Sequence, residues 1–210
     1  MSTNEEKIEA AAAAAELVMD GMTVGLGTGS TVTFLLRALV GREVRYVATS
    51  PRTEEAAREL GLHLEPFDSL DRLDLAIDGA DQVDPAGWVI KGGGAAHTRE
   101  KIVAAAAERF VVIVSSDKLV EALGPPVPLE LLPFGLPATL RSLGTVEVRD
   151  VPPSPDGGVI ADYLGPVDDP AELAERFGAA PGVVEHGLFP PALVSEIIVG
   201  RAGGAERLRL

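Results

Sequence analysis

Apolar and polar positions alternate along the first half of the chain in the pattern of strands followed by helices. Short runs rich in β-branched residues end in glycine or acidic residues, and longer stretches rich in alanine and leucine follow them. The short runs predict buried strands over residues 22–26, 44–49, 73–77, 88–90 and 110–115. The longer stretches predict helices over 5–20 and 95–109, and two more that end at residues 40 and 60. In the first helix, the predicted buried side carries Ile8, Ala12, Leu17 and Val18. This alternation of elements favours an α/β fold with a doubly wound parallel sheet.

The pattern changes after Gly124, where prolines at 125, 126, 128 and 133 mark a boundary. Beyond it the chain predicts a helix over 137–143, a helix that ends at 177 with Asp168 or Asp169 as its cap, and strands over 145–151, 159–164, 183–189 and 195–201. The two strands on either side of Asp156-Gly157 suggest an antiparallel pair, as in an α+β module. We predict a catalytic domain over residues 1–124 together with about 200–210, and a small α+β domain over 125–199 that serves as a lid or an assembly surface.

The candidate chemistry follows two of the predicted strands. Strand 73–77 runs into Asp78-Gly79-Ala80-Asp81, and strand 88–90 runs into Lys91-Gly92-Gly93-Gly94, ahead of a helix that carries Glu100 in its first two turns. Open α/β sheets bind ligands at the carboxyl ends of their strands, which is where these groups lie. Each motif alone is common in turns and helix ends. Together, a lysine and several carboxylates around a glycine-rich loop predict a site for an anionic substrate.

A second glycine-rich turn, Gly27-Thr28-Gly29-Ser30-Thr31, joins the first strand to the next helix. Backbone N–H groups at such a helix start can bind phosphate, and Ser30 or Thr31 is suited to cap the helix. The turn is not a P-loop, because Gly29 stands where the lysine is required. It is not a dinucleotide fingerprint either, because Ser30 replaces the third glycine. The turn therefore favours a smaller phosphorylated ligand.

Lysine is scarce in this chain, occurring only as Lys7, Lys91, Lys101 and Lys118. Lys91 and Lys118 each come just after a predicted core strand. A compact point charge is therefore indicated at both places.

Composition excludes several classes of function. The net charge of −14 argues against nucleic acid or an anionic membrane as partner, and the absence of cysteine excludes disulfides and zinc–sulfur sites. His63, His97 and His186 lack metal-ligand spacing, so we read them as surface or packing residues and expect no metal site. The N-terminal stretch lacks a basic region typical of a signal peptide, and no apolar run approaches the ~18 residues of a membrane span. We expect a cytoplasmic protein.

The motifs at 27–31, 78–81, 91–96, 98–101 and 116–118, with the segment 181–189, together resemble those of ribose-5-phosphate isomerase, type A. The resemblance covers nearly the whole chain. It implies a Rossmann-like domain with a smaller α+β domain, no metal or organic cofactor, a homodimer or homotetramer, and a role in the non-oxidative pentose phosphate pathway. The residues that it implies for the substrate site are Thr28, Gly29, Ser30, Thr31, Asp78, Gly79, Ala80, Asp81, Lys91, Gly92, Gly93, Gly94 and Lys118. Gln82, His97 and Pro51 depart from the family's usual residues.

The resemblance also implies a mechanism, the interconversion of D-ribose 5-phosphate and D-ribulose 5-phosphate through an enediolate. Glu100 matches the base that moves the proton between carbons. Lys91, with the N–H groups of Gly92 to Gly94, is the candidate oxyanion partner. Asp81 is a candidate for hydroxyl proton transfer and Asp78 for ring opening, and these two roles could be exchanged. The phosphate is expected near Lys118, Lys91 or the turn at 28–31.

Two other classes of function remain open from the sequence. One is a sugar-phosphate-binding regulator without catalysis, since this fold class also hosts such regulators and coenzyme A transferases. The other is an isomerase or deaminase acting on a different sugar phosphate, although a deaminase would be expected to use a histidine.

Overall fold

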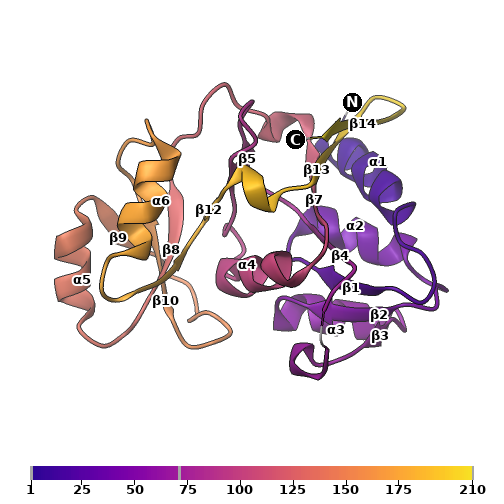
Figure 1. The fold of residues 1–210 in the computed structure, drawn as a ribbon, viewed down its shortest axis with the longest axis horizontal. Helices are drawn as coiled ribbons and strands as arrows, with labels where there is room; N and C mark the ends of the chain where they lie inside the picture. Colours follow the sequence, from indigo (N-terminus) through magenta and orange to yellow (C-terminus); the bar gives the residue numbers. More distant parts are fainter. Residues whose placement is uncertain (1, 71, 210) are drawn as a thin grey trace.

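A large parallel sheet forms the centre of the protein in the computed structural model, which describes residues 2–70 and 72–209 (Figure 1). Its seven strands lie in the order β14-β13-β7-β4-β1-β2-β3. Their bounds are β1 Thr23–Leu26, β2 Arg45–Ala48, β3 His63–Leu64, β4 Leu75–Asp78, β7 Phe110–Ser115, β13 Glu196–Arg201 and β14 Gly204–Arg209. All neighbours from β13 to β3 are parallel, and only β14 pairs antiparallel, with β13. The predicted doubly wound α/β fold is confirmed.

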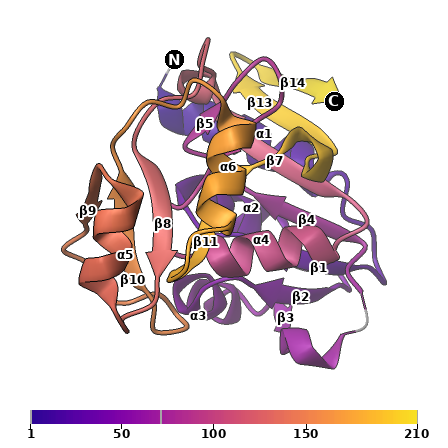
Figure 2. The ribbon, with the colours of Figure 1, turned by 60° about the vertical axis from the view of Figure 1, so that its left-hand side comes forward.

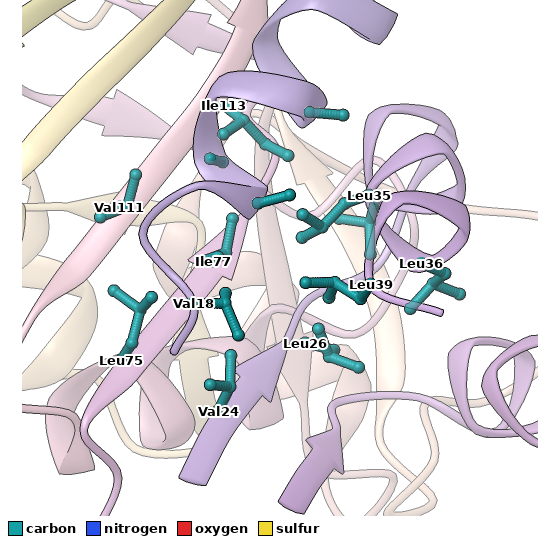
Figure 3. Close-up of a cluster of buried hydrophobic side chains, with 14 of the residues drawn as sticks. Val18, Val24, Leu26, Leu35, Leu36, Leu39, Leu75, Ile77, Val111 and Ile113 are labelled. Carbon is teal, nitrogen blue, oxygen red and sulfur yellow. The ribbon is translucent and has the colours of Figure 1, made fainter. Parts of the chain in front are cut away.

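Helices cover both faces of this sheet. The helices that pack on the sheet are α1 Thr3–Ala15, α2 Ser30–Ala38, α3 Pro51–Glu59 and α4 His97–Ala106. Side chains of α1, α2 and α3 form one apolar core with the sheet, and α4 joins a second core on the opposite face (Figures 1 and 3). Every residue of β7 is buried, and Val111 and Ile113 enter the first core while Val112 and Val114 enter the second. This is why the sequence of β7 is a continuous apolar run rather than an alternating one.

The first helix is shorter than predicted and buries a different side. It ends at Ala15 instead of residue 20. Ile8 and Ala12, predicted to be buried, are exposed, Ile8 to 47%. Val18 is buried as predicted, but it lies beyond the end of the helix. The buried positions on α1 are the alanines Ala10, Ala11, Ala14 and Ala15. Small side chains allow α1 to lie close to the sheet, so burial here does not follow side-chain size.

The second half of the chain builds a separate four-stranded antiparallel sheet in the order β11-β8-β10-β9, seen beside α5 and α6 in Figures 1 and 2. Its elements are β8 Val127–Leu131, α5 Leu136–Leu143, β9 Val146–Val148, β10 Val159–Tyr163, α6 Pro170–Gly178 and β11 Val183–His186. The predicted antiparallel pair around residues 156–157 is confirmed as β9 with β10. Asp169, not Asp168, caps α6, accepting from the N–H groups of Ala171 and Glu172.

One strand in this half was missed and two predictions were wrong. No prediction was made for β8, since prolines and Glu130 obscure its apolar pattern. The strand predicted over 183–189 divides at Gly187 into β11 and β12 (Leu188–Phe189), and β12 joins a small third sheet with β6 (Val89–Ile90) and β5 (Gln82–Val83). The strand predicted over 195–201 in the small module is β13 of the large sheet.

The chain therefore rejoins the large sheet at Glu196. The division of the chain into two domains stays a prediction. The remaining elements are single 3-10 turns, η1 Phe67–Ser69, η2 Ser116–Lys118 and η3 Pro191–Leu193. Within the described residues, no helix is both long and apolar enough to cross a membrane.

Candidate active site

A pocket of about 170 Å³ opens at the carboxyl ends of β1, β4 and β7, where the sheet places its loops. Its volume is below the ~300–1,000 Å³ typical of sites for drug-sized ligands, so it suits a small metabolite. The lining residues are Lys7, Thr28, Gly29, Ser30, Thr31, Gly79, Ala80, Asp81, Lys91, Gly92, Gly93, Gly94, Glu100 and Lys118. Every residue predicted for the site thus lines this pocket except Asp78.

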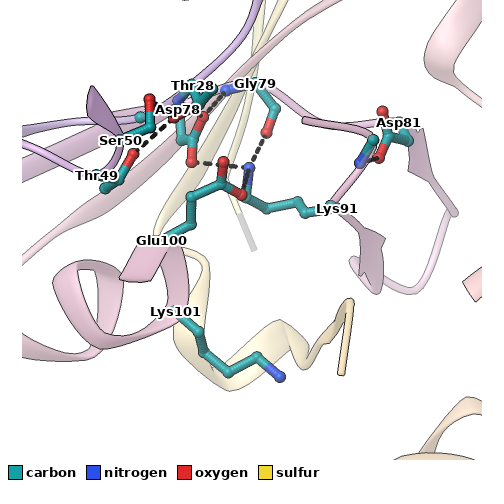
Figure 4. A network of polar contacts seen from close by, with 12 residues as sticks. Thr28, Thr49, Ser50, Asp78, Gly79, Asp81, Lys91, Glu100 and Lys101 are labelled. Atoms are coloured by element: carbon teal, nitrogen blue, oxygen red, sulfur yellow. Dashed lines mark hydrogen bonds and ion pairs between the residues drawn. The ribbon is translucent and has the colours of Figure 1, made fainter. Parts of the chain in front are cut away.

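A buried ion cluster forms the floor of the pocket (Figure 4). The Lys91 Nζ lies 2.8 Å from Asp78 Oδ2 and 3.0 Å from Glu100 Oε2, and it donates a hydrogen bond to the Gly79 carbonyl at 2.6 Å. All three charged side chains are at most 4% exposed. The ammonium therefore has one hydrogen bond and two ion pairs, all within 3.0 Å, which fix the position of the cation.

The cluster depends on how closely β1 and β4 approach each other at their ends. A Cβ atom at Gly27 would lie 1.8 Å from Asp78 Cγ, so only glycine fits there. Asp78 Oδ1 accepts from the N–H groups of Thr28 at 3.1 Å and Gly79 at 2.7 Å. Asp78 is thus held beneath the pocket and serves as the fixed counter-ion of Lys91.

Burial shifts the protonation equilibria of all three groups. Burial, and after it the charge of Asp78, raises the pKa of Glu100 to about 8, while Lys91 offsets part of this rise. Burial also raises the pKa of Asp78, against the opposing effect of Lys91. Burial lowers the pKa of Lys91, but the carboxylates of Asp78 and Glu100 outweigh it and hold this pKa above its usual range. The cluster therefore combines a permanent cation with a carboxyl group that can exchange a proton near neutral pH.

Asp81, in the turn between β4 and β5, is the third carboxylate of the site, and it contacts the glycine loop that follows β6. Asp81 Oδ2 accepts a hydrogen bond from the Gly93 N–H at 2.8 Å, so this N–H, one of the predicted oxyanion donors, is occupied in the structure. Gly92 has φ +113°, and Ala95 has φ +60°, a left-handed conformation that disfavours a non-glycine residue by about 1–2 kcal/mol. Such strain persists where the surrounding contacts determine the backbone, and it is concentrated at functional sites.

Cationic groups gather at the other end of the pocket, in a region we call the basic corner (Lys7, Ser30, Thr31 and Lys118). The Lys7 Nζ donates to Ser30 Oγ at 3.0 Å, and Lys118 follows in the turn after β7. That turn is held by Glu6 of α1, whose Oε2 accepts from the N–H and hydroxyl of Ser116, both at 2.7 Å.

The start of α2 differs from the prediction. Gly29, at φ +140°, occupies the N-cap position, and neither Ser30 nor Thr31 caps the helix. The first N–H groups of α2 consequently remain available at the basic corner for an anion.

Lys7 is the lining residue that sequence reasoning missed. It lies near the start of the chain on a helix with no visible motif, and only the packing of α1 over the sheet brings it to the pocket. The scarcity of lysine was the one signal that could have indicated it. His97 and His186 are buried and His63 is exposed, and none lines the pocket. Within residues 2–70 and 72–209, no group of histidine, aspartate and glutamate side chains could hold a metal ion.

A larger hollow of about 610 Å³ borders another face of α4, next to Thr98, Arg99 and Ile102. Two of its charged pairs, Arg99 with Asp156 and Arg58 with Glu54, neutralise each other. It contains no cluster comparable to Asp78, Lys91 and Glu100. The smaller pocket is therefore the candidate active site.

Comparisons of the sequence and of the fold find similar proteins of one family. The family model described as ribose 5-phosphate isomerase A (phosphoriboisomerase A) matches residues 45–204. The ribose-5-phosphate isomerase A of Rhodopseudomonas palustris (strain HaA2) is 41% identical over 225 residues, which cover 97% of each chain.

Solved structures agree with this assignment. That of ribose 5-phosphate isomerase A from Methanocaldococcus jannaschii superimposes with a TM-score of 0.93 at 34% identity, covering 100% of both chains. A D-ribose-5-phosphate isomerase in complex with phospho-erythronic acid gives a TM-score of 0.94 at 34% identity, also covering 100% of both chains. The chain belongs to the ribose 5-phosphate isomerase A family.

Proposed function

We propose that this protein interconverts D-ribose 5-phosphate and D-ribulose 5-phosphate, with Glu100 as the base that moves a proton between C2 and C1. The observation that carries the proposal is the contact of Glu100 with Lys91 in the wall of a pocket too small for a nucleotide cofactor. A related isomerase has been solved with phospho-erythronic acid, a phosphorylated sugar acid, which supports the same class of ligand.

Each side chain in the pocket has a chemical task in this reaction. Glu100 takes the C2 proton of the open-chain aldose and returns it to C1 of the enediolate. Lys91 is the fixed cation beside the developing oxyanion, and such preorganised charge is commonly the largest catalytic effect. Asp81 lines the pocket and is suited to move the proton between the two oxygens, whereas the buried Asp78 is better placed to hold Lys91.

The phosphate belongs at the basic corner in this proposal. Lys7, Lys118 and the N–H groups at the start of α2 line this corner and favour an anion. Lys118 pairs with Asp117 at 3.2 Å, and we expect the phosphate to share or replace that partner. Lys91, the third candidate for the phosphate from the sequence, is instead paired with Asp78 and Glu100 and donates to the Gly79 carbonyl.

Replacing Lys118 by alanine should raise KM about tenfold or more while kcat falls less than about threefold. The phosphate is remote from the reacting carbons, so its contacts are the same in the substrate and the transition state. Steady-state kinetics with ribose 5-phosphate measure both constants. Arg141→Ala, which removes an exposed cation from α5, is the control and should behave as the wild type. A variant that loses kcat with KM unchanged would place Lys118 in the chemical step.

The pH profile should report on Glu100. With a pKa of about 8 in the free enzyme, the base form becomes populated as pH rises, so kcat/KM should increase about tenfold per pH unit below that value and level off above it. Burial lowers the pKa of His97 and of His186 to about 4, so neither changes charge in this range. A profile that stays flat from about pH 6 to 9 would contradict a raised pKa at Glu100.

The raised pKa of Glu100 also makes the free energy of unfolding depend on pH. Because the folded chain holds the Glu100 proton more tightly than the unfolded chain, the stabilising effect is complete below the ordinary value of 4.5 and is lost as pH rises through about 8.

The direct test of the function is turnover of ribose 5-phosphate, followed by the appearance of the ketose, in the presence of a strong chelator. We expect undiminished turnover, since Lys91 supplies the positive charge that a metal would otherwise provide. Parallel assays with other aldose phosphates separate this function from isomerisation of a different sugar. Tight binding of ribose 5-phosphate without any ketose would favour a regulator.

The protein is further proposed to act in the cytoplasm as a homodimer or homotetramer. Large apolar side chains that remain exposed in the small module support an assembly surface there, namely Leu132, Phe134, Val148, Val151, Leu164 and Val184. Light scattering would measure the oligomeric state.

A further inference from the structure

Arg149, which follows β9 in the small module, extends across to the glycine loop of the candidate active site. Its Nε and Nη2 atoms pair with the two carboxylate oxygens of Asp162 on β10, both at 2.6 Å. Its remaining terminal nitrogen, Nη1, donates to the Gly92 carbonyl at 2.8 Å and approaches the Gly93 carbonyl at 3.5 Å. The two side chains are only 17% and 18% exposed, so this guanidinium is largely withdrawn from water.

The Gly92–Gly93 backbone is bound from both sides. On the side of the small module its carbonyls face Arg149, and on the pocket side the Gly93 N–H donates to Asp81 at 2.8 Å. The Gly92 carbonyl also accepts from the N–H of Ala95, the residue in a left-handed conformation. The Gly92 carbonyl therefore links Ala95, whose backbone is strained, to Arg149 of the small module.

Little space is left for this loop to move. A Cβ atom on Gly92 would lie 2.7 Å from Pro128 Cβ and 2.8 Å from His97 Nδ1, and one on Gly93 would lie 2.7 Å from Asp81 Oδ1. With β8 and α4 behind the loop and Asp81 in front, a rotation of the peptide between Gly92 and Gly93 would move the Asp81 carboxylate.

A cross-strand pair that merely stabilises β9 and β10 would need only the two contacts between Arg149 and Asp162. The third contact reaches a carbonyl 57 residues away in sequence, on the wall of the pocket. The planar guanidinium can satisfy both partners at once, because its donors point in fixed and different directions.

We propose that Arg149 is a positioning residue, which, oriented by Asp162, holds the Gly92–Gly93 peptide so that Asp81 is aligned for proton transfer. The proposal rests on the proposed isomerase function. Its kinetic consequence is a loss in kcat with little change in KM, because Arg149 lies away from the basic corner where the phosphate is bound.

The test is Arg149→Met, which removes the donors and keeps the length of the side chain. Since a small misplacement of a reacting group can cost about 100-fold, we expect kcat to fall about 10- to 100-fold and KM to change less than about twofold. Arg176→Met is the matched control, because Arg176 is a cation of the same module that stacks on Tyr163 and Phe177 and does not contact the loop. It should retain wild-type kcat.

A second measurement is independent of turnover. The Gly93 amide should exchange its hydrogen faster in Arg149→Met than in the wild type, because its hydrogen bond to Asp81 is no longer held in place. Asp162→Asn leaves Arg149 present but less firmly oriented, and it should show the same two effects at smaller size; it decides the question if Arg149→Met does not fold.

Wild-type kcat together with unchanged Gly93 exchange in the folded variants would overturn the role of Arg149. An inactive wild-type protein would instead contradict the isomerase function, and the exchange measurement would still report whether Arg149 holds the loop.

Discussion

Replacing Glu100 by glutamine is expected to remove most of the turnover and to leave the fold and the affinity for ribose 5-phosphate intact. Glutamine keeps the shape of the side chain but cannot accept the C2 proton, and loss of a general base typically costs about 10²- to 10⁴-fold. The variant should be no less stable than the wild type, because it removes a carboxyl group that burial already disfavours as an anion. Turnover assays, ligand titration and denaturant unfolding measure the three quantities.

The control for this variant is Glu108→Gln, which changes a half-exposed glutamate just beyond α4. It should retain wild-type kcat, and the rise of kcat/KM with pH should persist. Near-normal turnover by Glu100→Gln would remove Glu100 from the role of base, whatever its position in the pocket.

Replacing Lys91 by methionine is expected to have the largest effect on stability. Methionine fills much of the space but leaves Asp78 and Glu100 buried beside each other without a cation. Breaking a buried ion pair by removing one partner costs about 3–5 kcal/mol, and we expect a loss of that order together with loss of turnover. Urea unfolding at neutral pH measures the change in the free energy of unfolding.

The double variant Lys91→Met/Glu100→Gln separates electrostatics from packing. It should recover part of the lost stability, because only Asp78 then remains as an unpaired buried carboxyl group. The deficit of the single variant should also shrink as the pH is lowered, since protonation neutralises the unpaired carboxylates. A single variant that unfolds at the same urea concentration as the wild type would contradict the view that Lys91 holds the cluster together.

The sequence predicted best where one physical rule acts alone. The strand at 110–115 is apolar throughout because both faces of the sheet bury it, and its predicted and observed bounds coincide. Asp78, Lys91 and Glu100 could be assigned to one site because ligands bind at strand ends in this fold class. In the structure, the carboxylates of Asp78 and Glu100 lie within 3.0 Å of the Lys91 Nζ.

Features that depend on packing between distant parts of the chain could not be predicted from the sequence. Ile8 is apolar yet exposed, because α1 packs through its alanines. Strand β8 contains Pro128, which argued against a central strand, but the Pro128 carbonyl still accepts from the Gly187 N–H at 2.7 Å. Lys7 reaches the pocket, and Arg149 reaches the carbonyls of the glycine loop, from elements far away in sequence, and no local pattern marks either of them.

Helix α1 finds its partners at the opposite end of the chain, since it packs against β13 and β14 as well as β7. During translation this first helix leaves the ribosome early, whereas β13 emerges only after everything up to Ser195 has been synthesised. At about 5–20 residues per second the delay is on the order of ten seconds or more. Because α1 also packs on α2, which carries Ser30, strands β13 and β14 supply only part of the support that holds Lys7 at the basic corner. We therefore expect a nascent chain that still lacks these two strands to hold Lys7 less firmly than the complete chain does.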